Sequence, residues 1–137
     1  MAAIDQSEML EMVVERAQQL ATCLKGTLIV LHVVTEKMES LANASYGDLI
    51  LGSVDQTIME AEDAVRNEIG RRLESVGVKS SVLELIGGAP AKAVQEQLKQ
   101  RNAVMLVVGQ PKSRLGSVAT SMAKHAACDV YIVRYHE

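Results

Sequence analysis

The sequence has no tryptophan, no phenylalanine and only three tyrosines among its 137 residues. It therefore lacks the aromatic side chains on which single-stranded nucleic acids stack their bases. Its 14 basic residues are scattered and are outnumbered by 17 acidic ones, so the chain has no cationic stripe for a phosphate backbone. We expect no nucleic acid among its partners.

Cysteines and long apolar runs are also scarce. The two cysteines, Cys23 and Cys128, stand far apart without CxxC spacing, which is typical of small buried side chains in a reducing compartment. No stretch approaches the roughly 20 apolar residues that cross a bilayer. No basic segment followed by an apolar run opens the chain, as it would in a signal peptide. These features predict a cytoplasmic protein with no membrane partner.

The sequence is rich instead in aliphatic residues, and hydrophobic residues make up 48% of it. That share can fill a core, whereas a disordered chain cannot offset its chain entropy by burial. The length suits one domain that covers residues 1–137.

Strand patterns and helix patterns alternate from end to end. Strands are predicted at residues 1–4, 27–34, 78–86, 103–108 and 130–135, and helices at residues 7–25, at 54–76, from Pro90 onward and at 117–126. The segment 78–86 alternates between apolar and polar residues, which favours a strand near the edge of a sheet. A long connection, 35–52, contains a possible small surface element at 46–51. The alternation predicts an α/β fold, an open parallel sheet of five strands with helices on both faces.

Ligands of such sheets bind beyond the carboxyl ends of the strands, where the strand order reverses. Asp5, Val33 and Gly109 stand at strand ends, and Gly116 and Ser117 open the last helix near the same edge. A glycine, free helix N–H groups and a serine hydroxyl can together hold a phosphate. The alternative is an ordinary strand end followed by an ordinary helix cap.

Six short segments, taken in order, resemble those of the universal stress proteins. They are Asp5-x-Ser7, LHVV at 31–34, GAP at 88–90, LVVG at 106–109, GSVA at 116–119 and CDVYIV at 128–133. The resemblance covers essentially the whole chain. It implies a doubly wound five-stranded sheet with the strand order 3-2-1-4-5. The same resemblance implies a homodimer formed through the last strand, with Val130, Tyr131, Ile132 and Val133 at the interface. It also implies a stress-response role through protein partners whose identity the sequence does not give.

The family divides into members that bind ATP and members that do not. In the binders a glycine, two residues, a second glycine, nine residues, and then glycine with Ser or Thr surround the phosphates. This chain keeps Gly109 and Gly116-Ser117, but the middle glycine is absent and the loop between them is short. The non-binding branch, without a cofactor, is therefore predicted. If ATP with Mg²⁺ binds after all, the expected contacts are Asp5, Val33, Gly109, Gly116, Ser117 and Val118.

No catalytic or metal site is predicted. The three histidines, His32, His125 and His136, have no metal-ligand spacing. Asp5, Ser7 and His32 could meet at the strand ends as a hydrolytic triad, but capping by Asp5 and Ser7 beside a strand histidine is the simpler interpretation. The start of the chain also departs from the family. The first strand, central in the expected order, has only residues 1–4, so either it is short or the native chain begins earlier.

Overall fold

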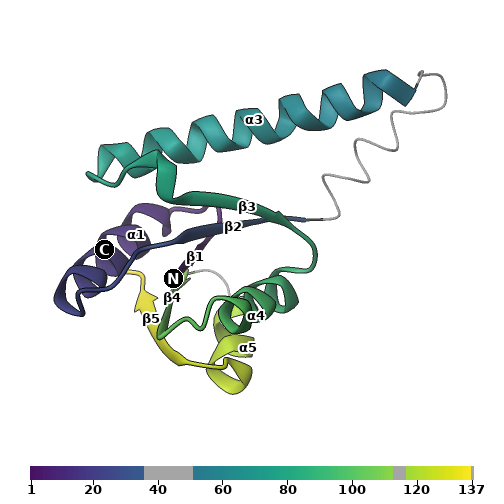
Figure 1. Cartoon of the computed structure of the whole chain (residues 1–137). Helices are drawn as coiled ribbons and strands as arrows, with labels where there is room; N and C mark the ends of the chain where they lie inside the picture. The colour runs from purple at the N-terminus through teal and green to yellow at the C-terminus, as the bar shows by residue number, and fades with distance from the viewer. Residues whose placement is uncertain (36–50, 113–116, 137) are drawn as a thin grey trace.

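The computed structural model describes residues 1–35, 51–112 and 117–136, without the side chains of residues 51–58 and 117. Strands and helices alternate within these ranges (Figure 1). The elements are β1 (Ala2–Ile4), α1 (Leu10–Cys23), β2 (Val30–Val34), α3 (Leu51–Ser75), the 3₁₀ turn η1 (Ser80–Val82), β3 (Leu83–Gly87), α4 (Pro90–Gln100), β4 (Met105–Gln110), α5 (Ser117–His125) and β5 (Asp129–Arg134). The possible surface element at 46–51 lies outside the described residues, except for Leu51, where α3 begins.

The five strands form one parallel sheet with the order β3-β2-β1-β4-β5. This confirms the predicted fold class and strand order. The central strand β1 is only three residues long and still pairs with both β2 and β4. The strand order reverses between β1 and β4. The helices that follow these two strands, α1 and α5, therefore lie on opposite faces of the sheet.

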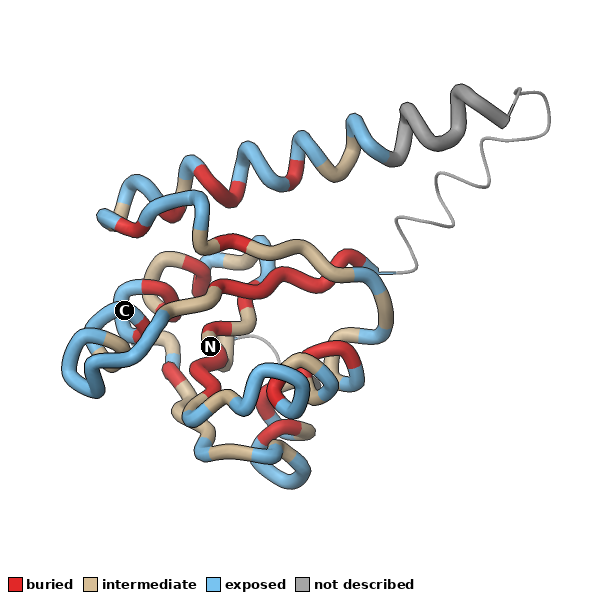
Figure 2. The backbone as a smooth tube through the Cα atoms, in the orientation of Figure 1, coloured by how far each residue is buried: buried red, intermediate tan, exposed pale blue. Residues whose placement is uncertain are grey.

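The helices cover both faces of the sheet, and each face has its own core. Side chains of α1 and α3 pack against one face, and side chains of α4 and α5 pack against the other. Figure 2 shows the buried backbone running along the central strands. Every residue of β2 is buried, because helices cover it on both sides, which explains its continuous run of aliphatic residues.

The segment 78–82 was predicted as the first half of a strand, and this prediction is wrong. The chain is instead tied to the end of α3: the N–H of Val78 donates to the Leu73 carbonyl at 3.0 Å, and the Ser80 hydroxyl donates to Glu74 at 3.1 Å. The 3₁₀ turn follows, and β3 begins only at Leu83. β3 does lie at an edge of the sheet, as predicted.

Other element boundaries differ by a few residues from the predicted ones. β2 begins at Val30 rather than at residue 27, because its pairing with both neighbours starts there, opposite Ala2 and Leu83. β4 continues to Gln110 because it pairs with β5 as far as Arg134, so Gly109 lies inside the strand and does not end it. Both cysteines are free, but Cys23 is exposed, and the prediction that it is buried is wrong. No helix in the described part of the chain is long and apolar enough to span a bilayer.

Candidate ligand pocket at the strand ends

The loop between β1 and α1 is shaped by its own side chains. The Asp5 carboxylate accepts a hydrogen bond from the Ser7 N–H at 3.1 Å, and the Ser7 hydroxyl accepts one from the Met9 N–H at 3.2 Å. The Leu10 N–H donates to the Ser7 carbonyl at 3.3 Å, which closes a turn. Helix α1 therefore begins at Leu10, and Ser7 caps the turn before the helix rather than the helix itself.

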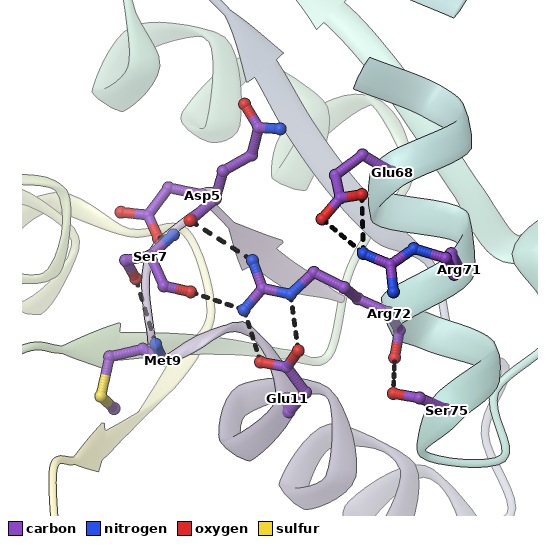
Figure 3. A network of polar contacts seen from close by, with 9 residues as sticks. Asp5, Ser7, Met9, Glu11, Glu68, Arg71, Arg72 and Ser75 are labelled. Atoms are coloured by element: carbon purple, nitrogen blue, oxygen red, sulfur yellow. Dashed lines mark hydrogen bonds and ion pairs between the residues drawn. The ribbon is translucent and has the colours of Figure 1, made fainter. Parts of the chain in front are cut away.

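A cation from α3 holds this loop from outside (Figure 3). The Arg72 guanidinium donates two hydrogen bonds of 2.5 Å to the Glu11 carboxylate. It also donates to the carbonyls of Gln6 and Ser7, at 3.3 and 2.8 Å. Mainly because of the hydrogen bonds between the two side chains, the pKa of Glu11 is lowered and that of Arg72 is raised.

His32 joins β2 to β1 at the same edge. Its Nδ1 lies 3.0 Å from the Ile4 carbonyl, and the residue is 9% exposed. Since a carbonyl only accepts, this contact places a proton on Nδ1. Although Asp5, Ser7 and His32 line one pocket, no hydrogen bond joins any two of their side chains. Each is engaged with the nearby backbone, so the arrangement favours capping over a hydrolytic triad.

A pocket of about 340 Å³ opens where these strand ends meet. Four of the predicted site residues line it: Asp5, Val33, Gly109 and Val118. Gly116 lies outside the described residues, and Ser117 is described only by its backbone, at the start of α5. The predicted nucleotide contacts are thus brought together as far as the structure describes them.

Sequence reasoning missed part of the lining. Ile4, Met9, Val94 and Pro90 also line the pocket. Pro90 had a usable signal, because the Gly87–Pro90 turn follows an adjacent strand at the same edge. Met9 had none, since a methionine in a helical apolar pattern is ordinarily core.

Gly109 has a packing role that the sequence did not reveal. A Cβ at this position would lie 2.9 Å from Val13 Cγ2 and 3.1 Å from Met9 Cβ. Helix α1 therefore crosses β4 at a distance that only glycine permits. The close approach of α1 is by itself sufficient to require this glycine.

In the described part of the chain, the edge strand β5 pairs with β4 on one side only. The Tyr135 N–H donates to the Gln110 carbonyl of β4 at 3.3 Å. Because the backbone groups of successive strand residues point to alternate edges, Val130, Ile132 and Arg134 direct theirs away from β4. A hollow of about 290 Å³ lies between this edge and α1, where Arg16 donates to the Tyr131 hydroxyl. The predicted interface residues Val130, Tyr131 and Ile132 are half-buried and Val133 is buried.

Among the residues that the structure describes, no three potential metal ligands gather as a cation site.

The fold and the pocket define a doubly wound α/β domain with a hollow at its switch point, large enough for a small organic ligand. The model of the universal stress protein family matches residues 1–134. The chain belongs to the universal stress protein family.

Several solved structures share the fold. The universal stress protein UspA from Lactobacillus plantarum matches with a TM-score of 0.68 and 20% identity, over 96% of this chain and 94% of that one. A universal stress protein in complex with cAMP matches with a TM-score of 0.61 and 21% identity, over 97% and 93%. The Archaeoglobus fulgidus universal stress protein in complex with dAMP matches with a TM-score of 0.58 and 20% identity, over 96% and 93%. Among curated proteins no match was found.

Proposed function

We propose that this chain is a homodimeric stress-response protein that acts through protein partners and does not bind ATP. The observation that carries the proposal is the short connection between Gly109 and Gly116, only six residues long and without the middle glycine of ATP-binding relatives. A triphosphate needs many backbone N–H groups around it, and a short loop offers few. Gly109 is no argument for a nucleotide, because the packing of α1 requires that glycine in any case.

The dimer proposal depends on the free edge of β5. An apolar edge strand with unpaired backbone groups is a liability that pairing with a second copy removes. Charge occurs only at the two ends of this strand, at Asp129 and Arg134. Protein partners are then expected to bind the dimer, since the described residues offer no catalytic constellation.

The pocket supports a second candidate, the binding of an adenine mononucleotide. Its volume of about 340 Å³ suits a nucleoside with one phosphate, and two relatives of the same fold were solved with cAMP and dAMP. Exposed Asp5 can accept hydrogen bonds from ribose hydroxyls, and the backbone at Val33 lines the same pocket. A mononucleotide has a single phosphate and does not need the long phosphate-binding loop.

Calorimetric titration separates these candidates. Purified protein is titrated with ATP and Mg²⁺, with AMP and with cAMP, and is denatured separately to detect nucleotide carried through purification. No heat from any of them supports the first proposal. Heat from AMP or cAMP that Asp5→Asn abolishes supports the second candidate, and micromolar ATP binding with one site per chain refutes the first proposal.

Sedimentation equilibrium tests the dimer. Ile132→Lys places a charge in the middle of β5, on a half-buried side chain that also packs against the core under α4 and α5. It is expected to give monomers, with folding checked by circular dichroism, at concentrations where the wild type is dimeric. Leu24→Lys is the control for added charge alone, because Leu24 is 58% exposed at the end of α1. A wild type that is monomeric throughout refutes the dimer, and an Ile132→Lys dimer places the interface elsewhere.

A further inference from the structure

One arginine of α3 touches the outside of the pocket wall without entering the pocket. Arg72 makes four hydrogen bonds across the chain, two to the Glu11 carboxylate and two to backbone carbonyls of the β1–α1 loop. Figure 3 shows the guanidinium lying between α3 and this loop. The Arg72 side chain is only 18% exposed, so these contacts are partly shielded from water.

The carbonyls that Arg72 holds belong to the segment that walls the pocket. Asp5, Ser7 and Met9 line the pocket, and Arg72 bonds to the carbonyls of Gln6 and Ser7 between them. The Ser7 carbonyl also accepts the Leu10 N–H, so Arg72 braces the turn that orients all three lining side chains. The four bonds come from three different nitrogens of the forked guanidinium, Nε, Nη1 and Nη2. A lysine has a single nitrogen and cannot reproduce this spread of donors.

We propose that Arg72 is a positioning residue that fixes the β1–α1 loop as a wall of the strand-end pocket, and thereby couples the docking of α3 to the shape of that pocket. The affinity of any ligand that touches Asp5 or Ser7 then depends on Arg72, which does not line the pocket. The ligand part of this inference rests on the mononucleotide candidate above, whereas the loop part does not.

The neighbouring arginine supplies a matched control. Arg71 pairs with Glu68 one turn away on the same helix, at 2.8 Å, with side chains 72% and 45% exposed. It carries the same charge on the same element and makes no bond to the loop in the described structure. Figure 3 shows both arginines side by side on α3.

Three variants separate positioning from a simple ion pair between helices. Arg72→Met removes all four hydrogen bonds and the charge. Arg72→Lys keeps the charge opposite Glu11 but loses the fork. Glu11→Gln keeps the fork and its two carbonyl bonds but loses the charge. Urea unfolding reports the stability of each, and amide hydrogen exchange by NMR at Met9 and Leu10 reports the order of the loop.

We expect Arg72→Met and Arg72→Lys to speed exchange at Met9 and Leu10 by about tenfold, because hydrogen bonds from a charged donor are lost. Glu11→Gln and Arg71→Met should change it less than about threefold. Equal effects of Glu11→Gln and Arg72→Lys would overturn the proposal, since the ion pair alone would then order the loop. Should Arg72→Met not fold, the comparison of the other two variants still decides.

Titration with AMP tests the ligand part. If the wild type binds AMP, Arg72→Lys should raise its Kd by about fivefold or more, whereas Arg71→Met should leave it unchanged. An unchanged Kd in a variant with faster exchange overturns the claim that the loop walls the ligand. If the wild type does not bind AMP, the mononucleotide candidate fails, and the exchange result alone decides the role of Arg72.

Discussion

The pocket has two unlike sides. On the β1–α1 side the chain is held by polar contacts, from Asp5 and Ser7 within the loop and from Arg72 outside it. On the β4 side the wall is held by shape, because Gly109 lies directly beneath Met9 and Val13 of the α1 region. One side is fixed by hydrogen bonds, and the other by close packing that is possible because Gly109 has no Cβ.

The difference matters for what each side tolerates. A hydrogen bond in a partly exposed loop is replaced by water when it is lost, so its removal costs little. A steric fit in a packed interior has no such replacement, because protein cores are as dense as organic crystals. We therefore expect the apolar side to be the more sensitive to substitution, and the polar side to change loop order more than stability.

Gly109→Ala should have the largest effect. The added Cβ would overlap Val13 Cγ2 and Met9 Cβ, neither of which is the free end of a flexible chain. We expect the free energy of unfolding to fall by about 3 kcal/mol, the upper part of the range for overpacked cores. Urea denaturation measures it. Gly26→Ala is the control, because its Cβ would meet nothing within 4 Å. Equal stabilities of the two variants would contradict the steric account.

His32→Leu comes next. The substitution removes the donor to the Ile4 carbonyl in a site that is 9% exposed, and it leaves the shape of the core roughly intact. A loss of about 2 kcal/mol is expected, as for other buried acceptors that lose a partner. His32→Asn, whose amide can donate from a position close to that of Nδ1, should recover part of this loss in the same assay. No difference between Leu and Asn would show that the hydrogen bond contributes nothing.

Ser7→Ala should cost less, about 1 kcal/mol, as is typical for the loss of one hydrogen bond. Its hydroxyl accepts the Met9 N–H, and water can take its place at this half-buried position. Thermal unfolding gives the stability, and Ser7→Thr, which keeps the hydroxyl, should remain close to the wild type. A loss as large as that of Gly109→Ala would reverse the ranking of the two sides.

Much of this fold could be predicted from the sequence, because apolar runs, turns and helix patterns are local signals. The segment 78–82 could not, since its alternation is that of a strand while its hydrogen bonds go back to the end of α3. In the site, Asp5, Val33, Gly109 and Val118 were predicted from strand ends and family resemblance, and they do line one pocket.

The physical roles of the site residues were less accessible. The requirement for glycine at 109 comes from Val13, nearly a hundred residues earlier in the chain. Arg72 reaches Glu11 and Gln6 over separations of 61 and 66 residues. The helical pattern places Arg72, three residues after Ile69, beside the buried face of α3 and Arg71 away from it. Only the packing of α3 on α1, however, decides that Arg72 meets the loop.

The smallest expected effect is a pH dependence that belongs to one ion pair. The pKa of Glu11 is lowered in the folded protein, chiefly by the hydrogen bonds from Arg72, below its unfolded value of about 4.3. The pair therefore stabilises the fold fully above that unfolded pKa, and the stabilisation is lost as the pH falls through the lower folded pKa. Because both side chains are partly exposed, at 34% for Glu11 and 18% for Arg72, the contribution should be below about 1 kcal/mol. Urea unfolding of the wild type and of Arg72→Met from pH 7 to pH 3 measures this contribution. The difference in their free energies of unfolding should narrow below about pH 4. The corresponding difference between the wild type and Arg71→Met should stay small throughout. If the difference in the free energy of unfolding between wild type and Arg72→Met keeps its size on acidification, the hydrogen bonds to the carbonyls account for the whole effect of Arg72, because carbonyls do not titrate.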